Sequence, residues 1–289
     1  NVLLNGEYKG CYQLCDQIDV RKGRVDIKEM KPEDNTGEAL SGGYLIEIDA
    51  NASKEPCYFW SSKGIPVTIK SPDDDKITSQ QKKYIKEAFN NLETRVFSDN
   101  FIHESWGYYK YFDIDSFLKH FIVGELSGNT DTYWSTYMYK ERGDDKIYTG
   151  PVWDFDIAFD NDSRTHTELN NPTGYLYSSG TASFAGGNNM QQFVTRIVKL
   201  DPVANARLKE MWAELRSSGV ITSESLVQWV NDTEQYLDQS QKLQYTRWNN
   251  LNFNVNMNYQ HLGSYPAEVD VVRKFINRRV TDLDEIINK

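Results

Sequence analysis

A pair of aspartates stands inside an otherwise apolar stretch of the sequence. Asp154 and Asp156 are separated by one residue within 152–159, and all the remaining positions of that stretch are apolar. Residues two apart in an extended chain point to the same side, so both carboxylates could bind one hard cation such as Mg²⁺ or Mn²⁺. The segment therefore predicts a divalent-cation site, with nearby Asp160 as a further candidate. A polar turn that caps a helix is the alternative.

Another acid stands in a polar loop upstream of this pair. Asp131 ends the stretch Glu125–Asp131 (ELSGNTD), which follows an apolar segment. Loops held by a rigid scaffold commonly present a general base. We therefore expect Asp131 to accept the proton of a substrate hydroxyl, and Asn129 of the same loop is a further candidate for the site.

The elements around these acids follow from the spacing of apolar residues. Helical spacing predicts a helix over 114–126, and two strand-like runs predict a β-hairpin over 133–149. The chain then has a helix, a loop aspartate, a hairpin and a second aspartate. This is the order of the catalytic parts in the larger lobe of a protein kinase.

The rest of the chain divides into strands followed by helices. Asn5-Gly6 predicts a hairpin turn whose second strand runs to Cys15, and further strands are predicted at 43–49, 58–60 and 66–70. One helix is predicted over 78–97. Three more are predicted to start at residue 202, at residue 222 or 223, and at residue 266, after a long polar surface loop over 161–189. The expected fold class is α+β, in one domain with a β-rich part over 1–72 and a mainly helical part over 73–289.

Composition excludes some classes of partner. Acids outnumber bases 42 to 32, and the net charge of −10 is unlike that of a nucleic-acid or anionic-membrane binder. Apolar runs such as 121–123 are far too short to span a membrane. Cys11, Cys15 and Cys57 are interpreted as small buried residues, and pairing of Cys57 with either of the others stays open. No spacing typical of a zinc site is present.

Three stretches of the sequence resemble one known family. Asn5–Asp19 (NGEYKGCYQLCDQID), Glu125–Asp131 and Gly150–Asn161 (GPVWDFDIAFDN) are similar to the spore-coat protein H (CotH) kinase-like family, particularly its secreted bacterial branch. The last helix adds the matching Phe275–Arg279 (FINRR). The resemblance implies an atypical two-lobed kinase-like fold and a secreted or cell-surface location. It also implies transfer of phosphate from ATP, with Mg²⁺ or Mn²⁺, to Ser or Thr of a protein substrate.

The resemblance assigns roles to the acids already singled out. Asp131 corresponds to the catalytic-loop aspartate of the family and Asp154 to its metal-binding aspartate, with Asp156 as a supporting ligand.

The sequence also departs from the family pattern. Thr136 stands where such kinases have an Asn that holds a second metal ion. Asp16 and Gln17, candidate nucleotide-binding residues, stand where the family has Glu-Gln. The family domain is expected to begin upstream of this chain, with a basic segment that supplies a phosphate-contacting Lys. Lys28 and Lys70 could substitute for it, although an ordinary surface role is the alternative for both.

Two other functions fit part of the pattern. A non-catalytic protein could reuse the fold to bind glycans or cell-envelope proteins through loops rich in Tyr and Trp, of which the chain has 18 and 7. A glycosyltransferase could use Asp154-x-Asp156 with a nucleotide sugar, but it would need a βαβ sheet that the pattern does not predict.

Overall fold

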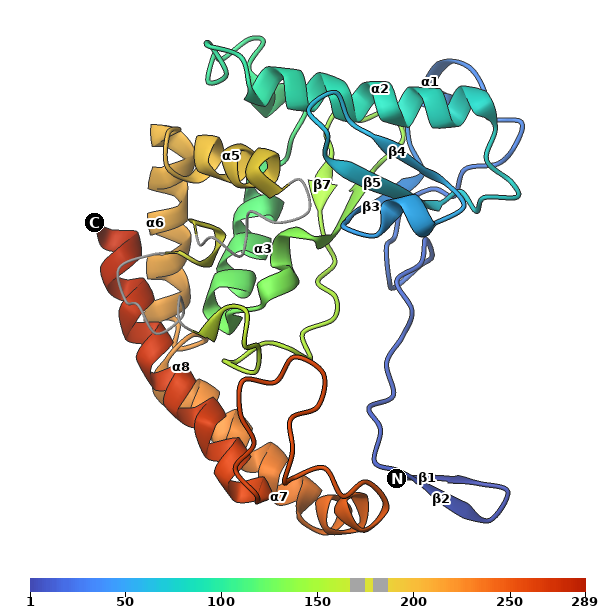
Figure 1. The fold of residues 1–289 in the computed structure, drawn as a ribbon. Coiled ribbons are helices and arrows are strands. Elements are labelled where there is room, and N and C mark those ends of the chain that lie inside the picture. The colour runs from blue at the N-terminus through green and yellow to red at the C-terminus, as the bar shows by residue number, and fades with distance from the viewer. Residues whose placement is uncertain (167–174, 179–186) are drawn as a thin grey trace.

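The computed structural model describes residues 1–166, 175–178 and 187–289. Within these ranges the chain forms a two-stranded hairpin, a five-stranded sheet and seven α-helices (Figure 1). The predicted mixture of strands and helices is therefore confirmed. No helix in the described ranges has both the length and the apolar composition that crossing a membrane requires.

All strand pairs in the five-stranded sheet are antiparallel. The order across the sheet is β4 (Tyr58–Trp60), β5 (Pro66–Ser71), β3 (Tyr44–Asp49), β6 (Ser135–Lys140) and β7 (Tyr148–Thr149). The strands predicted before residue 72 and the later hairpin are confirmed. The hairpin predicted within the mainly helical part 73–289 joins this sheet, because β6 pairs along the whole of β3.

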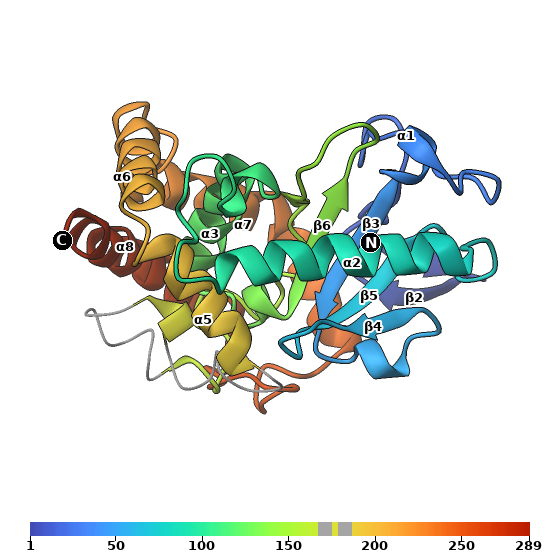
Figure 2. The same cartoon turned by 90° about the horizontal axis from the view of Figure 1, so that it is seen from above.

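One helix crosses the sheet. α2 (Ser79–Val96) lies over it in both views (Figures 1 and 2). Its start is fixed by a capping box, in which Thr78 accepts from the backbone N–H of Gln81 and the Gln81 side chain accepts in return. Phe89 of α2 packs edge-on against Phe59 of β4, with 6.1 Å between ring centroids. The sheet and α2 therefore share one hydrophobic core.

The other helices, apart from the short α1 (Gly37–Leu40), form the second part of the molecule. They are α3 (Ile114–Ser127), α5 (Gly187–Val198), α6 (Pro202–Ser217), α7 (Ser223–Arg247) and α8 (Tyr265–Asn288). The predicted helices are confirmed, but α5 was not predicted because it starts in Asn- and Gly-rich sequence. No residue of α7 is fully buried, and its apolar face is only partly buried, with Leu226, Val227 and Val230 against the core.

The polar stretch 161–189 is only partly a surface loop. Residues 167–174 and 179–186 lie outside the described residues, so the prediction is not tested there. Between them, Leu176 and Tyr177 are 3 % exposed. Their side chains pack in hydrophobic clusters, and their backbone N–H groups bind a carboxylate of α3, as described below.

The N-terminal hairpin consists of β1 (Val2–Leu4) and β2 (Glu7–Gly10). Asn5 and Gly6 have φ angles of 52° and 79°, which confirms the predicted turn. The second strand stops before Cys15, which we expected to be its end.

The three cysteines differ in exposure and form no disulfide. Cys57 is buried, Cys11 is half-buried and Cys15 is exposed, so the prediction of three buried cysteines is wrong for Cys15. The backbone N–H of Cys11 donates to the side chain of Gln244 at 2.7 Å, which ties the hairpin to α7 instead of to the sheet.

Candidate functional site

The loop that carries Asp131 is a short 3₁₀ turn between a buried helix and the sheet. α3 ends at Ser127 and is capped by Gly128, whose φ of 63° is a left-handed conformation that glycine adopts readily. The turn η3 (Thr130–Tyr133) follows, and β6 begins two residues after it. Oδ1 of Asn129 accepts a hydrogen bond from the backbone N–H of Asp131 at 3.3 Å. Asp131 is therefore held between two regular elements.

A buried ion pair anchors the end of α3. Glu125 and Arg279 are each 1 % exposed, and 2.9 Å separates Oε2 of Glu125 from Nη2 of Arg279. The Glu125 carboxylate also accepts from the Tyr133 hydroxyl at 2.8 Å. The backbone N–H groups of Leu176 and Tyr177 complete its partners at 2.6 and 3.0 Å. Burial raises the pKa of Glu125, and the Arg279 guanidinium opposes this shift.

Asp131 shares an arginine with a second aspartate. Nη2 of Arg164 lies 3.3 Å from Oδ1 of Asp131 and 2.6 Å from Oδ2 of Asp162. The Asp162 side chain is 1 % exposed, whereas that of Asp131 is 36 % exposed. The hydroxyls of Thr130 and Thr165 join the same two segments at 2.6 Å. Arg164 therefore compensates the buried Asp162 and leaves Asp131 open to solvent on one side.

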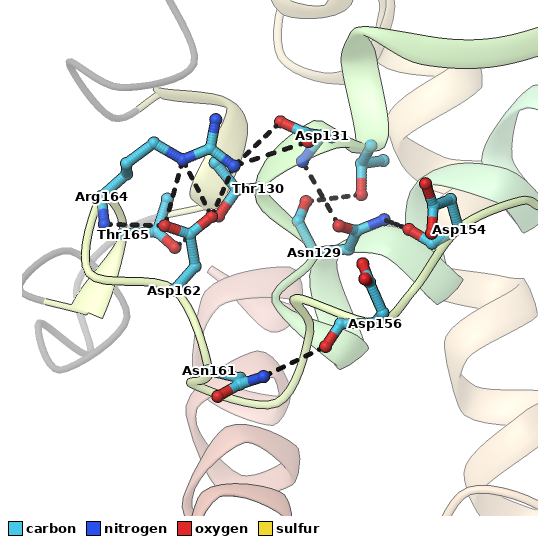
Figure 3. A network of polar contacts seen from close by, with 10 residues as sticks. Asn129, Thr130, Asp131, Asp154, Asp156, Asn161, Asp162, Arg164 and Thr165 are labelled. Carbon is cyan, nitrogen blue, oxygen red and sulfur yellow. Dashed lines mark hydrogen bonds and ion pairs between the residues drawn. The ribbon is translucent and has the colours of Figure 1, made fainter. Parts of the chain in front are cut away.

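The second acidic segment is not the extended strand that we expected. Residues 150–160 contain no strand, and Asp154 has a φ of 56°, so alternation does not set the direction of its side chain. Asn129 donates to the backbone oxygen of Asp154 at 3.4 Å, and Asn161 donates to that of Asp156 at 3.1 Å. Figure 3 shows Asp154 and Asp156 on one side of Asn129, and Asp131 directed toward Arg164.

Negative charge accumulates around these acids. Burial raises the pKa of Asp154, and the neighbouring carboxyl group of Asp156 raises it further. Asp131 and Glu47 contribute to the same shift. Burial also raises the pKa of Asp131, and the Arg164 guanidinium opposes that shift. A cation near Asp154 and Asp156 would offset this repulsion.

Two further candidates from the sequence have partners of their own. Thr136 is buried on β6, and its hydroxyl donates to the backbone oxygen of Thr132 at 2.5 Å. Oδ1 of Asp160 is hydrogen-bonded to Nδ1 of His166 at 2.8 Å. Oδ2 of Asp160 lies 3.9 Å from Nη2 of Arg278 on α8. Thr136 therefore stabilises the Asp131 loop, and Asp160 binds the C-terminal helix.

The candidate nucleotide-binding residues make local contacts. Asp16 is exposed and pairs with Arg21, and the backbone oxygen of Gln17 accepts from Arg24 at 3.2 Å. Gln17 also lines a polar cavity of about 390 Å³, in which neither Asp131 nor an acid of segment 150–160 takes part. The structure therefore does not bring Asp16 and Gln17 together with Asp131, Asp154 and Asp156, the acidic group.

The two lysines considered as phosphate ligands differ. Lys28 is exposed. Nζ of Lys70 on β5 lies 3.1 Å from the carboxylate of Glu47 on β3, which is itself buried. Glu47 also contributes to the raised pKa of Asp154, so Lys70 is paired with an acid that acts on Asp154.

Comparison with protein families supplies the identity of the domain. The family model described as CotH kinase protein matches residues 1–283 of the 289-residue chain. The chain belongs to the CotH kinase family. The resemblance found in the sequence is therefore confirmed. Searches of curated proteins and of solved structures gave no match.

The acidic residues fit a metal ion, which a kinase reaction would require, only in part. No three His, Cys, Asp or Glu side chains in the described ranges are grouped closely enough to hold a metal ion. Mg²⁺, however, commonly binds through one or two carboxylates and the phosphates of its substrate. Asp154 and Asp156 supply such a pair, and their mutual repulsion favours a shared cation. These two residues therefore fit a metal that arrives with a nucleotide.

Arg164 and Glu47 were not singled out from the sequence. Asp162 and Arg164 are two residues apart in a polar stretch, which is a local signal for an ion pair. The contact of Arg164 with Asp131 bridges 33 residues, and nothing in the local sequence indicates it. Glu47 lies in an apolar strand, where an acid signals a buried partner.

Proposed function

We propose that this CotH domain transfers phosphate from ATP to Ser or Thr of a protein substrate in a metal-dependent reaction. The observation that carries the proposal is the position of Asp131. It lies partly exposed on a turn between α3 and β6, close enough to act on the pKa of Asp154, in a chain of the CotH kinase family.

The proposed roles follow from the surroundings of each acid. Asp131 orients the substrate hydroxyl and accepts its proton, and Arg164 positions the Asp131 carboxylate. Asp154 and Asp156 hold a divalent cation, Mg²⁺ or Mn²⁺, which when bound neutralises charge on the phosphates. Lys70, oriented by Glu47, is the proposed phosphate contact on the sheet.

The two-lobed arrangement of a kinase is part of the same proposal. The sheet with α2 would form the nucleotide-binding lobe, and α3 with the helices around it would form the substrate lobe (Figure 1). Asp131 lies where the chain leaves the helical part and enters β6 of the sheet. A secreted or cell-surface location completes the proposal, on the basis of the sequence resemblance.

The test is labelling of a protein acceptor with γ-labelled ATP in the presence of Mg²⁺ or Mn²⁺. We expect Asp131→Asn to reduce labelling by about 100-fold or more, the usual contribution of a general base. Asp74→Asn is the matched control, because Asp74 is an exposed acid in a turn between β5 and α2. Equal labelling by Asp131→Asn and Asp74→Asn would remove Asp131 from the mechanism.

A non-catalytic binding function is the second candidate. Trp229 and Tyr236 on α7 are 68 % and 85 % exposed, and such aromatic rings stack on sugars. Glycan or cell-envelope binding that is lost in a Trp229→Ala variant, without any labelling by the wild type under either metal, would favour this function over the kinase.

A further inference from the structure

An exposed apolar stripe runs along α7. Trp229, Tyr236 and Leu243 are 68, 85 and 49 % exposed, and they follow one another at intervals of seven residues. Because seven residues make almost two helical turns, the three side chains form one row with about 10 Å between neighbours. α8 packs along another side of α7, where Leu226 and Val230 contact the core (Figure 1). The stripe is therefore directed away from the core of this chain.

The exposed charges of α7 change sign along the helix. Glu224 and Asp232 are exposed acids of its first half. In its second half the exposed bases Lys242 and Arg247 outnumber the one exposed acid, Asp238. Both bases already have ion pairs, at 2.9 and 3.4 Å, but such exposed pairs contribute little stability. Two α7 helices side by side would therefore bring unlike charges together only when they run antiparallel.

The stripe and these charges are arranged symmetrically about Tyr236. Trp229 and Leu243 each lie seven residues from it. Asp232 lies four residues before it and Lys242 six residues after it, a difference of about 3 Å along the helix axis. The other exposed acid of the first half and the other base lie twelve residues before it and eleven after it. A two-fold axis at Tyr236 would therefore set the acids of one helix against the bases of the other.

We propose that the stripe binds a second copy of this chain, with the two α7 helices antiparallel and the two-fold axis at Tyr236. The two Tyr236 rings would meet at the centre, and Trp229 of each copy would pack against Leu243 of the other. Aromatic side chains commonly supply much of the binding energy in protein interfaces. Tyr245 lies on the opposite side of α7 and lines the cavity that includes Asp156, so the contact is remote from that cavity. The symmetry favours a second copy over a glycan, because nothing in a sugar chain requires it.

Disulfide cross-linking tests the proposed register. Residue 232 of one copy would face residue 239 of the other, with about 2 Å between them along the helix axis. We expect Asp232→Cys and Gln239→Cys, each in a Cys11→Ser/Cys15→Ser background, to form a linked dimer when they are mixed and mildly oxidised. Neither variant should link to itself, because its two copies would lie about 9 Å or more apart along the axis, beyond the reach of a disulfide. Linkage of Asp232→Cys to itself would instead indicate a parallel pair and overturn the proposal.

Sedimentation equilibrium measures how strongly the copies associate. We expect the wild type to dimerise reversibly in the micromolar range, as small interfaces do. Tyr236→Glu should weaken the dimer by about 30-fold or more, since it removes the central aromatic ring from both copies. Val203→Glu is the matched control, because Val203 is an apolar residue of another helix, α6, is 64 % exposed and should leave association unchanged when replaced.

Exchange of charges gives a further test. Asp232→Lys should weaken the dimer by about 5-fold, and the double variant Asp232→Lys/Lys242→Asp should recover the loss. A wild type that stays monomeric at about 1 mM, equal association of Tyr236→Glu and Val203→Glu, absence of linkage in the cysteine mixture, or no recovery in the double variant would each overturn the proposal. These measurements require no catalytic activity, so their outcome is independent of the proposed kinase function.

Discussion

The carboxylate of Glu125 and those of Asp131, Asp154 and Asp156 have opposite surroundings, although Asp131 comes only six residues after Glu125 in the chain. Glu125 is buried, and an arginine, a tyrosine hydroxyl and two backbone N–H groups satisfy it. Of these aspartates, Asp131 has part of one arginine, whereas Asp154 is repelled by the carboxylates of Asp156 and Asp131. A satisfied carboxylate stabilises the fold, whereas an under-compensated group of them costs stability and is available for chemistry.

Removal of the partner of Glu125 should have the largest effect on stability. Arg279→Met leaves a buried carboxylate without its charge partner, so we expect a loss of about 3–5 kcal/mol in the free energy of unfolding. Arg207→Met is the matched control, since Arg207 pairs with Asp115 at the surface and should cost less than about 1 kcal/mol. Urea unfolding measures both, and equal losses would contradict the distinction.

Loss of Arg164 should have an intermediate effect, because it affects both kinds of carboxylate. Arg164→Met deprives the buried Asp162 of its side-chain partner, but the backbone N–H of residue 164 still donates to Asp162 at 2.8 Å. We expect a loss of about 1.5–3 kcal/mol in urea unfolding, typical of a hydrogen bond to a charged group. The double variant Asp162→Asn/Arg164→Met should recover part of it, and no recovery would show that Asp162 is not the residue left uncompensated.

Neutralising one of the open acids should instead stabilise the protein slightly. Asp154→Asn removes repulsion with Asp156 and Asp131, so we expect a gain below about 1 kcal/mol in metal-free buffer. Under the proposed function, Mn²⁺ with ATP should raise the melting temperature of the wild type, and the same variant should lose that rise. A destabilised Asp154→Asn protein would mean that this carboxylate is satisfied by its partners, as Glu125 is, and is not under-compensated.

The pH dependence of that gain gives the smallest and most specific signal. The pKa of Asp154 is raised in the folded protein from its ordinary value of 3.8, so the folded state binds more protons between the two values. Its contribution to stability is full below the ordinary value and decreases as the pH rises through the folded value. The advantage of Asp154→Asn should therefore shrink as metal-free samples are acidified from about pH 7 toward pH 4. An advantage that grows on acidification would reverse the assigned sign.

The sequence predicted local features of this fold better than long-range ones. The helix that becomes α3 and the turn at Asn5-Gly6 depend on neighbouring residues, and both are confirmed. The left-handed Asp154 follows from its tertiary surroundings, so strand alternation gave a wrong geometry for it. The burial of Tyr177 depends on Glu125, 52 residues earlier, and no local pattern reports such a partner.

The residue types of the candidate site stand out in the sequence, whereas its balance of charge does not. Asp131, Asp154 and Asp156 stand out as acids in loops or apolar sequence, and the structure brings them within electrostatic reach of one another. Arg164, which decides how much of their charge is compensated, comes from a polar stretch without periodicity. Charge balance depends on tertiary contacts, so it could not be derived from spacing.

The pairing of β3 with β6 also sets when this site can exist. Glu47 and Ser135, which meet across these strands at 2.7 Å, are 88 residues apart in the chain. Contacts of such long range require the closure of a long loop, which costs conformational entropy before the contacts stabilise the fold. They therefore tend to form late in folding. Because the Asp131 turn leads directly into β6, the acids are assembled only when most of the sheet is complete. An unfinished or unfolded chain would therefore carry all of these residues without bringing them together.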